Sequence, residues 1–302
     1  QIEGNFPLDV GDLSTLLADA YSTPKNARIV NFSWGSVAPG IYDTNAGKID
    51  AFLSANSDAA VFVSAGNTGT DKNTDRIPDQ NTIGAPATAK NVIVVGASRN
   101  ADDLGDANRP NQRATVSSNG PATAGAFGRI APLLMAPGND TGSLGLVSEF
   151  HCRSNDNNQT GPVECDVLAG QSSTSFASAA AAGAGLLIRD YFAQGFYPDG
   201  TNSNTGNAGD KVPTISGSLI KAILVTSAEW MHIANSNLPT APNLTRKFRG
   251  NREQGFGRIV LSNALPLNSY SGAVSGLIVG DGGGTGQAGT PVNSTGWDLS
   301  SP

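Results

Sequence analysis

Ser175 stands where a polar, serine-rich stretch gives way to the long apolar run 175–192. This run is apolar on nearly every side, which is typical of a helix buried in the core. Backbone N–H groups at the start of a helix lack partners within it and carry partial positive charge. They can therefore stabilise negative charge that develops on a substrate carbonyl oxygen beside the Ser175 hydroxyl. The simpler alternative is that Ser175 only caps the helix.

The loop TDKNTDRIPDQN carries a second set of residues whose types and spacing could bind a ligand. Its candidate Ca²⁺ ligands are Asp71, Asn73, Asp75, the carbonyl of Ile77, and Asp79. They occupy alternate positions, as the oxygen ligands do in the Ca²⁺ loop of an EF-hand. Arg76 replaces the central glycine, and Thr82 replaces the closing acid. The pattern indicates a structural Ca²⁺ site, with a solvated acidic turn as the alternative.

Cys152 and Cys165 flank the polar, turn-rich segment 153–164. We expect them to form a disulfide, which indicates an oxidising compartment, with free thiols as the alternative. His151 adjoins Cys152, but no further ligands accompany it to complete a zinc site. Glycosylation sequons in polar stretches fit a secreted, extracellular glycoprotein. The sequons begin at Asn31, Asn139, Asn158, Asn243 and Asn293, the first of them within an apolar strand.

The elements that must position these residues alternate along the chain. Helical apolar spacing is seen over 13–21, around 50–53, over 175–192 and over 219–230. Short apolar runs predict buried strands over 27–34, 59–66 and 91–98. This alternation predicts an α/β fold with a parallel sheet covered on both faces. The segment 254–265 is read as a turn that leads to a short closing element.

Composition divides the chain into two parts and excludes some functions. We expect an α/β domain over 1–265 and the opening of a truncated all-β domain over 266–302. The net charge is −6, with no basic excess to neutralise phosphates, so no nucleic-acid partner is expected. No apolar run reaches the length of about 18 residues that a membrane helix requires, so no membrane partner is expected either.

A series of motifs in order resembles the subtilisin-like serine protease family, the subtilases. The motifs are VNFSWGS (30–36), FVSAGNTG (62–69), GAPATAKNVIVVGA (84–97), VSSNGP (116–121), MAPG (135–138) and STSFASAAAAG (173–183). The resemblance covers about residues 25–265. It implies a three-layer fold with a mostly parallel sheet, followed by the start of the C-terminal β-sandwich that larger members carry. Ca²⁺ commonly holds the loops of this family, which supports the site in 71–79.

The resemblance also assigns roles to particular residues. It implies that the chain is a serine endopeptidase acting on peptide or protein substrates through an acyl-enzyme on Ser175. Asn67 would donate its side-chain amide to the oxyanion, together with the backbone N–H of Ser175. Two backbone stretches would line the substrate cleft and pair with an extended peptide. These stretches are Ser33, Trp34 and Gly35, and Ser64, Ala65 and Gly66.

Several positions depart from the family pattern. Ser173 replaces the glycine two residues before the nucleophile, and Ala179 replaces the following proline. Subtilases carry the triad in the order Asp, His, Ser. Only His151 and His232 occur here, and no D-[ST]-G or H-G-T segment precedes SWGS. We therefore expect this chain to be a fragment whose catalytic Asp and His come from an N-terminal chain outside it.

Two alternatives remain open. A subtilase-like fold without its Asp and His could serve as a catalytically inactive binding or structural module. Alternatively, Ser172, Asp210 and His232 follow the order of an esterase of the α/β-hydrolase class, with Gly170 to Thr174 as a degraded nucleophile turn. Thr174 is a branched residue where that strained turn needs a small one, which argues against the esterase.

Overall fold

The computed structural model describes residues 12–36, 39–69, 79–100, 111–122, 129–139, 172–202, 212, 215–231 and 250–268. Within these residues lies one sheet of four parallel strands in the order β1-β2-β3-β4. The strands are β1 (Ile29–Phe32), β2 (Ala60–Ser64), β3 (Ile93–Arg99) and β4 (Leu134–Asn139). The helices are α1 (Leu13–Tyr21), α2 (Thr44–Ala55), α4 (Thr174–Ala193), α5 (Gly217–Ser227) and the 3-10 helix η2 (Leu261–Asn263).

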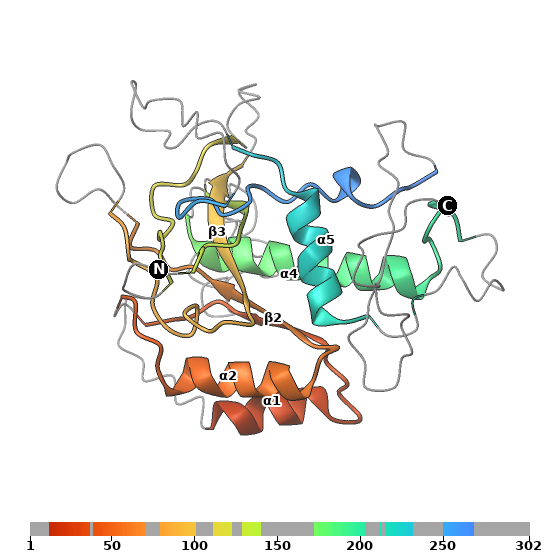
Figure 1. Ribbon diagram of the computed structural model, residues 1–302, viewed down its shortest axis with the longest axis horizontal. Coiled ribbons are helices and arrows are strands. Elements are labelled where there is room, and N and C mark those ends of the chain that lie inside the picture. The colour runs from red at the N-terminus through yellow and green to blue at the C-terminus, as the bar shows by residue number, and fades with distance from the viewer. Residues whose placement is uncertain are drawn as a thin grey trace, which may run out of the picture.

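The helices cover the sheet on both faces. Successive strand residues point to opposite faces, and the core divides accordingly. Ala60 and Phe62 of β2 pack in a cluster with residues of α4 and α5. Val61 and Val63 pack in a second cluster with residues of α1 and α2. Figure 1 shows α1 and α2 side by side below the sheet, with α4 and α5 away from them. The predicted α/β fold with a covered parallel sheet is confirmed.

Each of the four α-helices named above begins after a residue suited to cap it. Asp12 and Asp43 accept hydrogen bonds from backbone N–H groups of the first turns of α1 and α2. Ser173 and Ser216 do the same for α4 and α5. A side-chain oxygen at this position satisfies a donor that the helix leaves unpaired. The capping residues therefore fix where α4 starts, and with it the position of Ser175.

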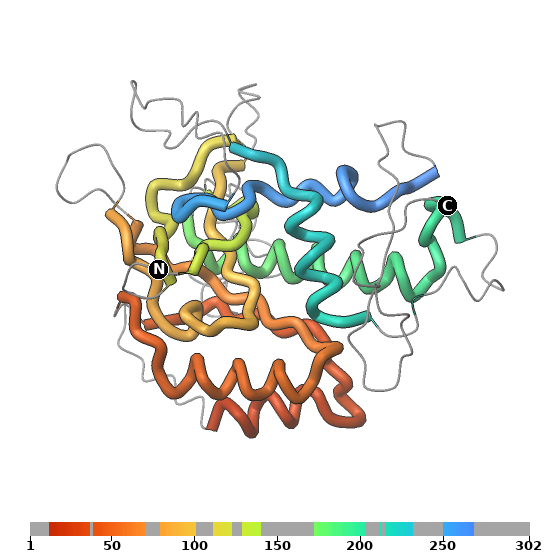
Figure 2. The backbone as a smooth tube through the Cα atoms, viewed as in Figure 1, coloured from red at the N-terminus to blue at the C-terminus, as the bar shows by residue number. Residues whose placement is uncertain are grey.

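The strand β4 differs from the sequence expectation, which assigned no element to residues 134–139. Its Pro137 and Gly138 are disfavoured in strands, which hid it from the apolar pattern. A proline is tolerated there because β4 lies at an edge of the sheet. The outer side of β4 is covered by the closing segment, since Met135 N donates to the Gly257 carbonyl and Ile259 N donates to the Met135 carbonyl. Figure 2 shows this segment, 250–268, in blue, passing beside α5.

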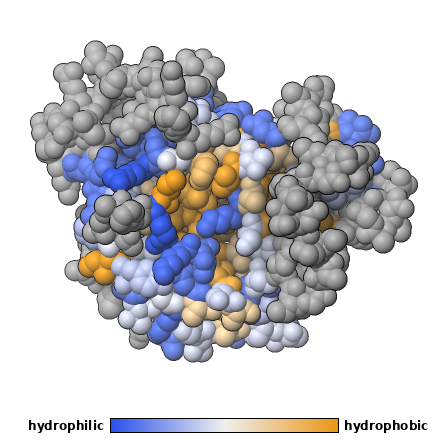
Figure 3. All heavy atoms as spheres, viewed as in Figure 1, coloured by the Kyte–Doolittle hydropathy of each residue, from blue (hydrophilic) through white to orange (hydrophobic). Residues whose placement is uncertain are grey.

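The described surface mixes polar and apolar side chains, consistent with the low content of charged residues, 15%. Figure 3 shows apolar side chains gathered near the centre of one face, with polar ones around them. Among the described residues, none of the helices combines the length and the apolar character needed to cross a membrane. The expected β-domain over 266–302 falls almost entirely outside the described residues and stays a prediction.

Close packing of α4 on the sheet depends on Gly185. A Cβ at this position would lie 2.7 Å from Cζ of Phe62, which is fully buried and cannot move aside easily. At Gly183, two residues earlier, a Cβ would meet nothing within 4 Å. Overpacking a core typically costs about 1–3 kcal/mol, whereas alanine in an open helix position gains up to about 1 kcal/mol over glycine.

We therefore expect Gly185→Ala to lower the free energy of unfolding by about 1–3 kcal/mol. The matched variant Gly183→Ala should leave it unchanged or raise it slightly. Urea unfolding followed by circular dichroism measures both values. Equal stability of the two variants would contradict the proposed contact between α4 and β2.

Candidate active site

The candidate site lies at the carboxyl ends of two neighbouring parallel strands. Ser33 follows β1, and Asn67 lies three residues after β2. Because β1 and β2 pair in parallel, these residues emerge at the same edge of the sheet. The N-terminus of α4 meets this edge and brings Ser175 in its first turn. Ligand sites of open α/β sheets form at such an edge.

The hydroxyl of Ser175 is half-buried and contacts the chain after β1. Its Oγ donates a hydrogen bond to the carbonyl of Ser33 at 3.1 Å. In return, Oγ of Ser33 lies 2.9 Å from the carbonyl of Ser175, to which it donates. The two serines thus join the start of α4 to the end of β1. A carbonyl oxygen cannot accept the proton outright, so this contact orients the Ser175 hydroxyl without activating it.

Asn67 is held in one orientation by Thr174. Its Oδ1 accepts hydrogen bonds from the backbone N and the Oγ1 of Thr174, at 2.8 and 2.9 Å. Thr174 is fully buried, and its Oγ1 also accepts from the backbone N of Gly66 at 3.1 Å. Because these bonds fix Oδ1, they also fix the direction of the Nδ2 group of Asn67.

The two expected oxyanion donors converge on one oxygen. Nδ2 of Asn67 lies 3.0 Å from Oγ of Ser173, and the backbone N of Ser175 lies 3.0 Å from the same atom. These are the distances at which an oxyanion hole holds its oxygen. The structure thus brings together the predicted pair Asn67 and Ser175, with Ser173 between them.

The turn that carries Asn67 rests on Ser118. Gly66 has a φ of +106°, which only glycine adopts readily, and a Cβ there would lie 2.9 Å from Oγ of Ser118. The backbone N of Ser118 donates to the carbonyl of Gly66 at 2.9 Å. Its Oγ accepts from the backbone N of Thr68 at 3.2 Å. Glycine at position 66 therefore permits both the turn and its support.

Arg113 lies beneath this turn and was not foreseen from the sequence. It is 1% exposed, and its Nη2 donates to the carbonyls of Gly69 and Ser117. Burial lowers the pKa of Arg113 to about 10, an effect that the charge of Glu253 opposes. The guanidinium remains charged at neutral pH. A single arginine in a polar stretch gives no sequence signal of burial, so nothing in the pattern could have indicated it.

The predicted cleft residues lie around the same edge. Ser33 and Gly66 contact the start of α4 through Ser175 and Thr174, while the ring of Trp34 packs against Phe32, with centroids 5.7 Å apart. The backbone N of Ala65 donates to the Val95 carbonyl at 2.9 Å, so this N–H is already used within the protein and does not face a bound peptide as a donor. The role of both stretches in peptide binding stays a prediction.

Several other predicted residues lie outside the described part of the chain. These are Asp71, Asn73, Asp75 and Ile77 of the Ca²⁺ loop, Cys152 and Cys165, His151 and His232, and Asp210. Asp79 is described, and its backbone carbonyl accepts a hydrogen bond from Nδ2 of Asn119 at 3.1 Å. Within the described residues, no group of three or more His, Cys, Asp or Glu side chains could hold a metal ion.

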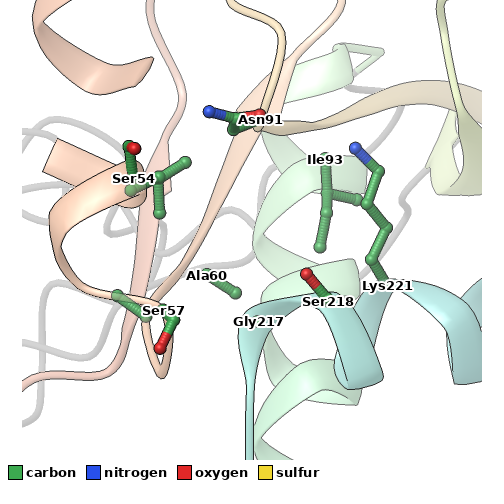
Figure 4. A pocket seen from close by; sticks show the side chains of 10 residues that line it. Ser54, Ser57, Ala60, Asn91, Ile93, Gly217, Ser218 and Lys221 are labelled. Carbon is green, nitrogen blue, oxygen red and sulfur yellow. The ribbon is translucent and has the colours of Figure 1, made fainter. Parts of the chain in front are cut away.

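A hollow of about 300 Å³ lies at the amino ends of β2 and β3, opposite the carboxyl ends that carry Ser33 and Asn67. Figure 4 shows it between α2, α5 and the first residues of β2 and β3. Lys221 reaches over Ile93, and its Nζ donates to the Val92 carbonyl at 3.1 Å. Burial, with a contribution from Arg129, lowers the pKa of Lys221. Because this hollow faces the amino ends of the strands, it is separate from the Ser175 site.

The Peptidase_S8 model, described as the subtilase family, matches residues 7–257. The chain therefore belongs to the subtilase family. It is 25% identical over 347 residues to the serine protease/ABC transporter B family protein tagD of Dictyostelium discoideum. It is also 25% identical, over 356 residues, to a second serine protease/ABC transporter B family protein of Dictyostelium discoideum, tagB.

These two alignments cover 88% and 92% of this chain but only 18% and 17% of the relatives. The chain thus spans less than a fifth of their length. Solved structures that match this chain include the prenylagaramide maturation protease PagA, at 19% identity and a TM-score of 0.47. That match covers 83% of this chain and 64% of PagA. Sphericase matches at 20% identity and a TM-score of 0.46, covering 82% of this chain and 60% of that one.

The role of the buried Thr174 hydroxyl, which bonds to Gly66 and Asn67, can be tested through stability. Thr174→Val keeps the shape of the side chain but removes the hydroxyl, which leaves the Gly66 N–H without its acceptor. We expect the free energy of unfolding to fall by about 1–3 kcal/mol, the cost of an unsatisfied buried polar group. Thr174→Ser retains the hydroxyl and should lose much less. Chemical denaturation of both variants checks this, and a valine variant as stable as the parent would refute this role of the Thr174 hydroxyl.

Proposed function

We propose that this chain forms the nucleophile-bearing part of a serine endopeptidase. The observation that carries the proposal is the convergence of the Asn67 amide and the Ser175 N–H on one oxygen, Oγ of Ser173. Two preorganised donors at this distance stabilise the negative oxygen of a tetrahedral intermediate. Membership of the subtilase family supports the same chemistry.

In the proposed reaction, Oγ of Ser175 attacks the carbonyl carbon of a peptide bond, and the carbonyl oxygen becomes the oxyanion. The proton of Ser175 passes to a histidine, which then delivers it to the leaving amine as the C–N bond breaks. Water hydrolyses the resulting acyl-enzyme. We propose that this histidine and its orienting aspartate come from a segment outside these 302 residues. The greater length of the two relatives is consistent with this proposal.

A catalytically inactive binding module is the second candidate. It is favoured by one observation, that the Ser175 hydroxyl donates to a carbonyl, which is no general base. Such a module would keep the peptide cleft around Ser33 and Gly35 but would not acylate. Reactivity of Ser175 distinguishes the two functions.

Three finer proposals rest on the sequence pattern. We propose that Ca²⁺ binds the loop 71–79, because its oxygen donors alternate as in known Ca²⁺ loops. We further propose a disulfide between Cys152 and Cys165, and an extracellular, glycosylated protein.

Labelling by a fluorophosphonate probe tests the endopeptidase proposal. The full-length protein should be labelled on Ser175, because the probe phosphonylates only an activated serine. Ser175→Ala should lose labelling and casein hydrolysis together. Ser172→Ala, three residues away, should retain both, whereas an esterase using Ser172 would show the reverse. Unlabelled Ser175 in native full-length protein would favour the inactive module.

Asn67→Asp tests the oxyanion assignment. The variant keeps an acceptor for Thr174 but replaces the amide donor with a negative oxygen. For hydrolysis of labelled casein, kcat should fall by at least about 10²–10³, the loss established for removing this donor in subtilisin itself, while KM changes little. Asn26→Asp adds the same charge on an exposed loop and should change neither constant. A rise in KM with unchanged kcat would assign Asn67 to substrate binding instead.

A further inference from the structure

Ser173 is one of the residues at which this chain departs from the family motif, and it is also the residue at the centre of the site. Its Oγ accepts from Nδ2 of Asn67 and from the backbone N of Ser175, each at 3.0 Å. The proposed function assigns these same two donors to the substrate oxyanion. The family glycine has no side chain that could take this position.

We propose that the Ser173 hydroxyl fills the oxyanion position in the resting protein and must rotate away before a substrate carbonyl can bind. The inference rests on the proposed function, because it concerns the same two donors. It makes Ser173 a positioning residue, which acts through Asn67 and Ser175 and takes no part in the covalent chemistry.

The backbone at Ser173 is fixed, so the side chain is the part that can move. Its backbone is extended, with φ −162° and ψ 145°, and its N donates to the carbonyl of Gly138 at 2.7 Å. A Cβ at Gly138 would lie 2.6 Å from the Ser173 carbonyl, so the two segments are closely packed. The side chain itself is half-buried. A serine hydroxyl moves between staggered rotamers without any backbone change.

The competition for the two donors depends on charge. A neutral hydroxyl and a neutral substrate carbonyl are acceptors of similar strength, so Ser173 opposes binding of the uncharged substrate. Hydrogen bonds to a charged oxygen are roughly twice as strong, so a developing oxyanion displaces the hydroxyl readily. Until then, Ser173 holds both donors in the orientation that the oxyanion requires. The residue therefore lowers ground-state reactivity and keeps the site preorganised.

Three variants at one position test this inference. Ser173→Gly and Ser173→Ala remove the hydroxyl, whereas Ser173→Thr retains one that can still cap the helix. In the full-length protein, we expect the rate constant of fluorophosphonate labelling at Ser175 to rise about 3- to 30-fold in the glycine and alanine variants, which corresponds to the strength of a capping hydroxyl. The threonine variant should stay within about twofold of the parent.

Stability provides a second readout with the opposite sign. Loss of the cap of α4 should lower the thermal midpoint of the alanine variant, and that of the glycine variant only slightly, while the labelling of both accelerates, a combination that a merely structural cap would not produce. Labelling of Ser175 at an unchanged or lower rate in both variants would overturn the inference and leave the proposed function standing. Failure of Ser175 to react in the parent and in every variant would overturn the proposed function and the inference with it.

Discussion

The hydrogen bonds between Thr174 and Asn67 are the constraint on which the site depends. They join the first residue of α4 to the turn after β2, two segments far apart in the sequence. Thr174 is fully buried, so water cannot compete for these bonds. Without them the exposed Asn67 carboxamide would be held only by the hydrogen bond from its Nδ2 to Oγ of Ser173. Thr174 therefore orients the amide of an exposed side chain through two hydrogen bonds, and orientation is what distinguishes an oxyanion site from an ordinary polar surface.

Two further supports hold the partners of this contact. From one side, α4 lies close against β2 because Gly185 leaves room for Phe62, which fixes the helix that carries Ser175. From beneath, Ser118 and the buried guanidinium of Arg113 bind the turn 66–69. Removing a cation from water is costly, and two carbonyl acceptors offset only part of that cost. The charged Arg113 side chain is thus buried, at a cost in stability, directly under the turn that positions Asn67.

Much of this arrangement could be predicted from the sequence. The apolar runs indicated α1, α4 and three strands, since burial on both faces leaves a continuous apolar signal. The motif around Ser175 and the strand end at Asn67 indicated the pair that the structure brings together. The strand β4 was missed because Pro137 weakens its pattern. The roles of Ser173 and Arg113 depend on contacts between distant segments, and a single sequence carries no record of such contacts.

The closing segment also shapes how the molecule meets other chains. Residues 257–259 bond to Met135 along the outer side of β4, and Pro137 in that strand offers no N–H. An uncovered strand edge is a template on which another polypeptide can add and from which aggregates grow. Here residues 257–259 of the same chain cover that edge. During synthesis, the outer edge of β4 stays exposed until residues 257–259 have been made and have folded onto it. Until then, the incomplete chain can self-associate along this edge.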